Sequence, residues 1–122
     1  MVLVEAGQVL LVQRKFEPRV GMWTLPAGFV EYDEHVAACA VRETKEETNL
    51  DVELEGLFGA YMAMDDPRVQ VVLLLYRCRR VGGELRAGDD AIDARFFPIN
   101  GTPKEIAFKA HEQALEDLRR QQ

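Results

Sequence analysis

Short apolar runs separated by polar turns occupy most of the chain, a pattern that predicts several β-strands. Residues 2–4 and 9–12 are rich in valine and leucine and flank a turn at residues 5–7. Residues 23–25 form a brief extended segment after a charged loop. Further strands are expected at residues 52–57, 58–64, 69–78 and 94–99, with a break at Gly56 or Gly59 and a tight turn at residues 82–83.

Two segments carry apolar residues at helical spacing instead. Asp33 can cap a first helix, which ends at Asn49, a residue that tolerates the left-handed conformation. A second amphipathic helix follows residues 101–103 and runs from Ile106 towards the C-terminus. Many strands with helices at two places favour an α/β (α+β) sandwich with a mixed sheet over a regularly alternating parallel fold.

Composition narrows the class of protein. The 122 residues and 48% hydrophobic content fit one domain spanning residues 1–122. A net charge of -6 argues against extended nucleic acid as a partner, because such proteins usually carry a basic stripe. The longest apolar run is far short of the ~20 residues that cross a membrane, and no leader pattern is recognised. The well-separated Cys39 and Cys78 fit a reducing compartment, so a cytoplasmic protein is expected.

The segment Arg42-Glu43-Thr44-Lys45-Glu46-Glu47 concentrates acidic residues on the first predicted helix. Glu43 and Glu47 lie one turn apart within about 40° of each other, and Glu46 falls about 60° to one side. Stacked like charges destabilise a helix, and a hard divalent cation such as Mg²⁺ or Mn²⁺ would offset the repulsion. The alternative is a solvated face on which the acids pair with Lys45 and Arg42.

Residues upstream and downstream extend this cluster into a longer pattern. It consists of Gly28, Glu34, Arg42-Glu43, Glu46-Glu47 and Asn49-Leu50. The spacing resembles the signature of the Nudix hydrolase family, which folds as a loop, a helix and a loop. Two positions depart from that signature: Thr44 stands at an aliphatic position, and Asn49 stands where glycine is usual. Asn is the next best residue after Gly at positive φ, so neither departure threatens the chemistry.

The resemblance implies a sandwich of helix, mixed sheet and helix, in which the signature helix presents glutamates to one or more Mg²⁺ or Mn²⁺ ions. Glu43 and Glu47 would be the principal metal ligands. Glu46 would be a direct or water-mediated ligand, and the carbonyl of Ala27 would complete the shell.

The resemblance also implies roles for the remaining charged positions. Arg42 would hold a neighbouring glutamate in place, and Glu34 would brace the loop onto the helix or bind a further metal. The general base stays open between Glu46 and an acid on a later loop. The loop candidates are Asp89, Asp90 and Asp93, and a solvated turn is the alternative for them.

Members of this family hydrolyse a pyrophosphate that joins a nucleoside to another group. The stretches at residues 17–18, 21–31, 42–44, 70–71 and 106–108 resemble the subgroup that includes ADP-ribose and FAD pyrophosphatases. The leading hypothesis is therefore a Mg²⁺-dependent hydrolase of ADP-ribose, FAD or a similar small-molecule nucleotide. A nucleoside triphosphate pyrophosphohydrolase is an alternative, and a non-catalytic sensor that binds a nucleotide sugar is another. The short N-terminal region leaves room for a strand supplied by a partner, as in a homodimer.

Substrate contacts are expected from aromatic and basic residues near the signature. Phe16 and Trp23 are candidates for stacking on a base or flavin, with a core position as the alternative for Trp23. Arg19 and Arg68 could reach phosphates, although solvated surface positions would explain both. Phe29 is expected in the core. His35 and His111 are expected on helix surfaces without a role.

Overall fold

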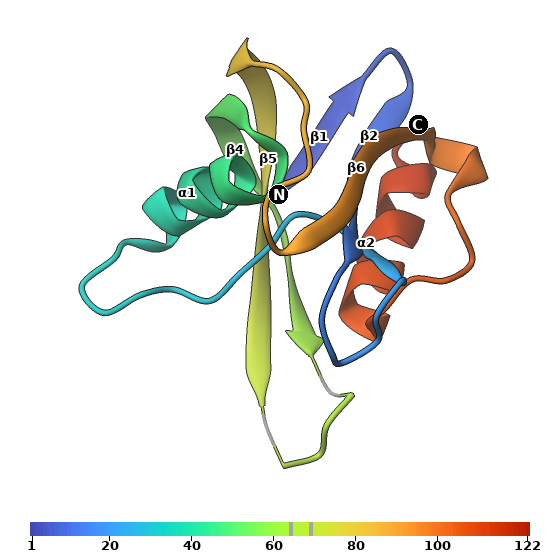
Figure 1. Cartoon of the computed structure of the whole chain (residues 1–122). Helices are drawn as coiled ribbons and strands as arrows, with labels where there is room; N and C mark the ends of the chain where they lie inside the picture. The colour runs from blue at the N-terminus through green and yellow to red at the C-terminus, as the bar shows by residue number, and fades with distance from the viewer. Residues whose placement is uncertain (64, 69) are drawn as a thin grey trace.

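The sheet of this protein is mixed and carries a helix on each side (Figure 1). The computed structural model describes residues 1–63, 65–68 and 70–122. Six strands occur in these ranges: β1 (Val2–Glu5), β2 (Gln8–Arg14), β3 (Trp23–Thr24), β4 (Leu50–Ala63), β5 (Val71–Gly83) and β6 (Ala91–Pro98). The helices are α1 (Val36–Thr48) and α2 (Lys109–Arg120), with a short 3₁₀ turn η1 (Ile99–Gly101) before α2. The predicted α/β sandwich with a mixed sheet is confirmed.

Strand β2 organises the sheet because it pairs along both of its edges. One edge is antiparallel to β6 over the whole strand. The other edge is divided: its first residues pair with β1 and its last residues with β3, both antiparallel. Strand β1 then pairs in parallel with β5, and β4 lies antiparallel to β5 at the far side. The path through the sheet is therefore mixed, as the order of the elements predicted.

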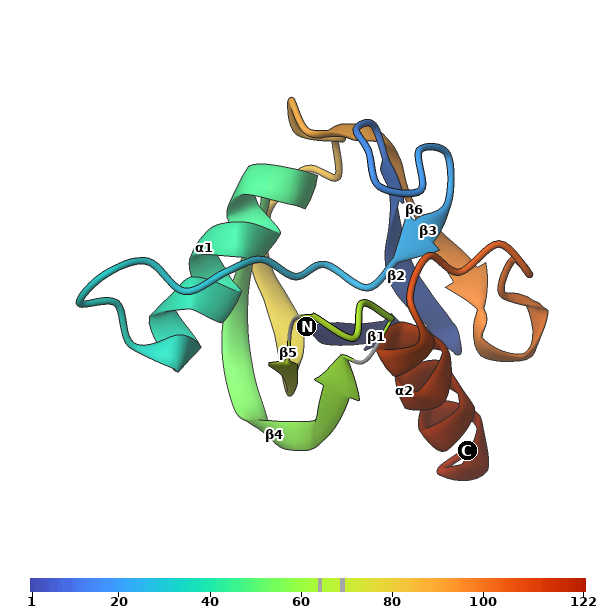
Figure 2. The same cartoon turned by 90° about the horizontal axis from the view of Figure 1, so that it is seen from below.

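Both faces of the sheet are buried, and the alternation of side chains in β1 and β2 shows this directly. Val2 and Val9 point to the core that contains the buried face of α2. Leu3 and Leu10, one position later, point to the core under Ala40 of α1. Figure 2 shows the two helices on opposite sides of the strands. Each fully buried Val or Leu contributes about 1.5–3 kcal/mol, so these short strands anchor the sandwich.

Helix α1 ends where the sequence predicts but starts later. Asn49 is the C-cap with φ of 64°, and its N–H donates to the carbonyl of Lys45, so the predicted left-handed cap is confirmed. The prediction that Asp33 caps the helix is wrong, because Asp33 has a φ of 62° and lies in the turn before the helix. His35 is the N-cap instead, and its Nδ1 accepts from the N–H of Ala37. His35 is exposed, as expected.

Three other boundaries differ from the prediction. Strand β4 continues through Gly56 and Gly59, where register shifts absorb the extra residues without ending the strand. Residues 82–83 pair with the start of β4 and do not form a turn. Ile106 precedes α2 and bridges to Trp23 in extended conformation, so the helix begins at Lys109. The predicted strand ends at residues 64 and 69 lie outside the described residues. In the described ranges, neither helix has the length and apolar character needed to cross a membrane.

Candidate active site

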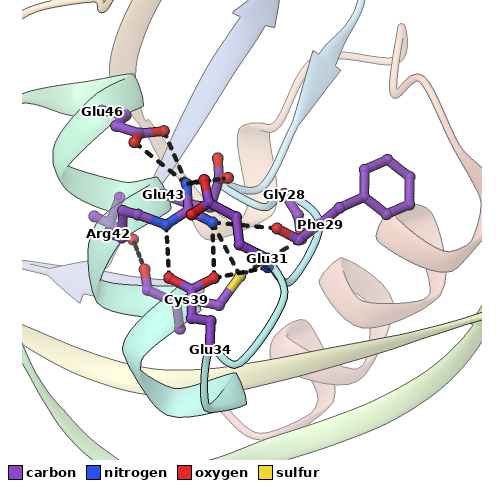
Figure 3. A network of polar contacts seen from close by, with 10 residues as sticks. Gly28, Phe29, Glu31, Glu34, Cys39, Arg42, Glu43 and Glu46 are labelled. Atoms are coloured by element: carbon purple, nitrogen blue, oxygen red, sulfur yellow. Dashed lines mark hydrogen bonds and ion pairs between the residues drawn. The ribbon is translucent and has the colours of Figure 1, made fainter.

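Arg42 ties the loop before α1 to the helix (Figure 3). Its Nε donates to Glu34 Oε2 at 2.6 Å and its Nη2 to Glu34 Oε1 at 2.9 Å, a bidentate pair. The same Nη2 donates to the carbonyl of Phe29 at 3.2 Å, and Glu34 also accepts the N–H of Glu31 at 3.0 Å. The hydrogen bonds from Arg42 lower the pKa of Glu34 to about 2. Glu34 thus stays ionised and holds the loop in place.

The remaining guanidinium nitrogen of Arg42, Nη1, contacts two glutamates of α1. Nη1 donates to Glu43 Oε1 at 2.9 Å and to both oxygens of Glu46 at 3.2 Å. The two glutamates differ in exposure, because 17% of the Glu43 side chain is exposed but 56% of the Glu46 side chain. Arg42 therefore lies between an acid on the inside of the loop and an acid at the surface.

Gly28 lies directly against the Glu43 carboxylate. A Cβ built on Gly28 would overlap the carboxyl carbon and both oxygens of Glu43. Glycine is the residue that permits this approach of backbone to carboxylate. The glycine of the signature therefore has a local geometric reason in this chain: the loop passes over the Glu43 carboxylate without a side chain in the way.

Glu47 is the most deeply placed acid of the cluster. Its Oε2 is buried and has no hydrogen-bond partner among the described residues. Burial raises the pKa of Glu47 to about 8, and the negative charge of Glu43 adds to this rise, whereas the charge of the N-terminal amino group and the Ala27 N–H oppose it. Burial also raises the pKa of Glu43. Burial thus disfavours the charged form of both neighbouring carboxyl groups, which a bound cation would offset.

This arrangement fits a hard divalent cation. Mg²⁺ binds through one or two carboxylates and keeps positions for water and phosphate oxygens, and Glu43 and Glu47 offer such a set with an orphaned oxygen. Ala27 lines the same cavity. No three acidic, histidine or cysteine side chains in the described ranges already converge as a metal cluster. In this structure Arg42 forms ion pairs with both Glu43 and Glu46.

A cavity of about 970 Å³ opens beside these acids. Its wall combines the end of β2, the loop after β3, the signature helix, β5 and the start of α2. The lining includes Glu43, Glu47, Ala27, Phe16 and Phe29. A volume in this range accommodates a nucleotide-sized ligand. The ring of Phe29 points away from the Arg42 network in Figure 3, and the side chain is 79% exposed. The expectation of a core position for Phe29 is therefore wrong.

Asp90 reaches the same cavity because a glycine docks its loop onto α1. The N–H of Gly88 donates to the carbonyl of Glu47 at 2.9 Å. A Cβ on Gly88 would overlap the carbonyl oxygen of Glu46, so this docking also needs glycine. Asp90 lines the cavity, and its charge is one cause of the raised pKa of Glu47.

The other loop acids lie elsewhere. Asp93 forms an ion pair with Arg95 at 2.5 Å and accepts the N–H of Ala94. Asp89 is exposed and does not line the cavity. Of the three loop candidates for the base, the structure places only Asp90 beside the signature acids.

The predicted substrate-binding residues divide into two groups. Phe16 lines the cavity and is 56% exposed, while Arg19 lies over the ring of Phe108 at 5.7 Å, next to the cavity wall. Trp23 is buried and meets Phe97 edge to face at 4.9 Å. Arg68 is exposed and pairs with its neighbour Asp66. Trp23 and Arg68 are absent from the cavity lining.

Sequence reasoning missed part of the cavity wall formed by α2. His111 is buried, lines the cavity and accepts the N–H of Leu25 at Nδ1, so its predicted surface position is wrong. Phe108 and Asp65 line the same wall. The spacing of His111 to Leu115 and Leu118 gave a usable signal, because i, i+4 and i+7 share one helix face.

Comparison with known proteins identifies the class. A NUDIX domain model matches residues 1–118, so the chain belongs to the NUDIX family. An ADP-ribose pyrophosphatase of Methanocaldococcus jannaschii is 42% identical over 120 residues, which cover 98% of this chain and 70% of that protein.

Solved structures agree with this assignment. A NUDIX hydrolase of Nitrosomonas europaea matches with a TM-score of 0.85 and 31% identity, covering 99% of this chain and 70% of that one. An ADP-ribose pyrophosphatase of Streptococcus suis matches with a TM-score of 0.71 and 28% identity, covering 97% and 87%. The resemblance that the signature indicated is confirmed: the chain is a Nudix hydrolase.

Proposed function

We propose that this Nudix hydrolase cleaves the pyrophosphate bond of ADP-ribose with the help of Mg²⁺ or Mn²⁺. The observation that carries the proposal is the partly buried pair Glu43 and Glu47 at the wall of a nucleotide-sized cavity, with Oε2 of Glu47 buried and without a partner among the described residues. The relative from Methanocaldococcus jannaschii, named as an ADP-ribose pyrophosphatase, favours this substrate over FAD. An acidic chain needs a bound cation at such a site to accept an anionic substrate.

Glu43, Glu47 and the carbonyl of Ala27 would hold the metal. The bound cation would neutralise the pyrophosphate oxygens and lower the pKa of an attacking water. Arg42 would position Glu43 through the 2.9 Å hydrogen bond and keep its carboxylate oriented. Glu46, at the outer side of Arg42, is the further candidate ligand.

Asp90 and Glu46 are the proposed acceptors of the proton from the attacking water. Asp90 is an exposed carboxylate on the cavity wall, so it can exchange its proton with solvent after each turnover. Glu46 is equally open to solvent but is held by Arg42 in this structure. Single substitutions of Asp90 and of Glu46 distinguish the two candidates, because the residues lie on different elements.

The test is hydrolysis with product analysis. ADP-ribose, FAD, NADH and nucleoside triphosphates are incubated with Mg²⁺ and with wild type, Glu47→Gln or Glu55→Gln. The expected result is AMP and ribose 5-phosphate from ADP-ribose, lost in Glu47→Gln and retained in Glu55→Gln, an exposed glutamate on β4. Inorganic pyrophosphate released from a triphosphate as the main activity would contradict the proposal. Binding of ADP-ribose without turnover would identify a sensor instead.

A further inference from the structure

In the described part of the chain, the cavity wall away from α1 holds two polar side chains, Asp65 and His111, each with one atom that forms no hydrogen bond. Asp65 lines the cavity with 14% of its side chain exposed. Its Oδ2 accepts the N–H of Lys109 at 3.3 Å and lies 4.0 Å from Arg19. Its Oδ1 is buried and has no hydrogen-bond partner in the described part of the chain. This carboxylate therefore offers one free acceptor in a protected place, which is costly unless a ligand uses it.

His111 supplies a donor in the same wall. Its Nδ1 accepts the N–H of Leu25 at 3.1 Å, so the ring proton of the neutral form resides on Nε2. Burial lowers the pKa of His111 to about 4, so the ring is neutral at pH 7. Within the described residues, Nε2 forms no hydrogen bond, while the side chain lines the cavity. The backbone of Leu25 thus fixes which nitrogen is the donor.

The surroundings suit a flat, neutral group. The ring of Phe108 lies 5.9 Å from the ring of His111, and Arg14 covers Phe108 at 5.0 Å. Phe16 adds an exposed aromatic face to the cavity. A phosphate at this place would meet the negative Asp65 and would have no proton for Oδ1. On the proposed function, the phosphates would lie at the metal beside Glu43 and Glu47, which leaves this part of the cavity for the nucleoside.

We infer that Asp65 and His111 form the base-specificity pair of this enzyme and bind the amino edge of adenine. Adenine presents an amino donor next to a ring nitrogen acceptor, which matches the Asp65 acceptor and the His111 Nε2 donor. Hypoxanthine presents a carbonyl oxygen and a ring N–H at the same positions, so both contacts would be reversed. The inference rests on the proposed function, because it assigns the adenosine half of the proposed substrate. Vicinal hydroxyls of a ribose share the donor and acceptor chemistry, and the experiment separates the two sources.

The test compares ADP-ribose with its hypoxanthine counterpart, in wild type, Asp65→Asn and Asp51→Asn. Asp65→Asn keeps an acceptor for the Lys109 N–H but replaces the free acceptor by an amide that also donates. Asp51→Asn is the matched control, because Asp51 is exposed and lies outside the cavity lining. Thermal unfolding shows that each variant is folded.

Wild type is expected to favour the adenine substrate by about tenfold or more in kcat/KM, and Asp65→Asn to lose most of this preference. The change is expected in KM, by about tenfold, with kcat nearly unchanged. Asp51→Asn should behave as wild type. Equal KM values for the two bases in wild type, or an unchanged preference in Asp65→Asn, would overturn the inference. A loss of binding to an analogue without ribose hydroxyls, with equal values for the two bases, would also overturn it and assign a ribose here.

Equilibrium binding separates this inference from the proposed function. AMP and IMP are titrated into wild type and Asp65→Asn without turnover. A preference for AMP in wild type that falls in Asp65→Asn supports the pair even when no ADP-ribose is cleaved. Equal binding of AMP and IMP by wild type, in an enzyme that does cleave ADP-ribose, overturns the pair and leaves the function intact.

Discussion

Gly28 shows how one residue sets the geometry of the acids. A methyl group at this position would occupy the space of the Glu43 carboxylate, so Gly28→Ala must move the loop or the acid. We expect kcat to fall by about 100-fold, because a misplacement of about 1 Å costs that much in a positioned site. Gly101→Ala is the control, since its added methyl meets only ordinary contacts. Steady-state kinetics with ADP-ribose checks this, and wild-type kcat in Gly28→Ala would refute the steric argument.

Substitutions of Thr44 test whether a threonine at the aliphatic position of the signature stabilises or destabilises the fold. The residue is fully buried, and its Oγ1 donates to the carbonyl of Ala40 at 2.8 Å, which already lies in the helix ladder. Thr44→Val removes a redundant hydrogen bond and buries a further methyl, so we expect stabilisation of about 0.5–1 kcal/mol. Thr44→Ser removes the methyl and should destabilise by about 1 kcal/mol. Urea unfolding measures both, and a destabilised Thr44→Val would show that the hydroxyl is needed.

His111 links stability to pH. Burial lowers its pKa to about 4, whereas the unfolded chain binds the proton near pH 6.5, so unfolding takes up a proton between these values. The contribution to stability is present above pH 6.5 and is lost as the pH falls towards 4. From pH 7 to pH 5 we expect this group to lower the free energy of unfolding by about 2 kcal/mol. His111→Asn should show a shallower decline over that interval, and an unchanged slope would contradict the assignment.

At the scale of elements, the end of α1 was readable from the sequence and its start was not. Asn49 is a known alternative to glycine at a left-handed cap, and the structure has it there. Asp33 looked like a cap by residue type, yet its positive φ excludes that position. Caps depend on backbone conformation, which the residue type only biases.

The cap at Asn49 can be measured directly. Its side-chain amide also donates to the carbonyl of Glu84 at 2.9 Å and so ties the helix end to the loop after β5. Asn49→Ala should destabilise by about 1–2 kcal/mol, because alanine at positive φ is strained and the hydrogen bond is lost. Asn49→Gly also lacks the hydrogen bond but is not strained at positive φ, so we expect it to be more stable than Asn49→Ala and less stable than wild type. Chemical unfolding checks this, and equal stability of the two variants would contradict a role for φ.

The strand breaks expected within β4 show why glycines are an unreliable sign of a strand end. Gly56 and Gly59 interrupt the alternation of side chains, and this resembles the end of a strand. In the structure both positions are register shifts within a single strand paired to β5. Long-range pairing with β5 decides between a break and a bulge, and a local pattern carries no information about it.

At the scale of the whole molecule, the cluster of acids on α1 was predictable from the sequence, but the part of the cavity wall that contains Asp65 and His111 was not. Glu43 and Glu47 share one helix, so their spacing in the sequence fixes their arrangement in space. Asp65 and His111 are far apart along the chain and line one cavity only because α2 packs on the sheet near β4. Topology brings such residues together, and one sequence without its fold does not show the result.

The central claim is that Glu43 and Glu47 form a divalent-cation site. Mn²⁺ binding, followed by loss of the free-ion electron paramagnetic resonance signal, tests it most directly and does not depend on turnover. Wild type and the control Glu55→Gln are predicted to bind Mn²⁺ alike, while Glu47→Gln weakens binding by at least about tenfold. Equal Mn²⁺ affinity in wild type and Glu47→Gln would contradict the account.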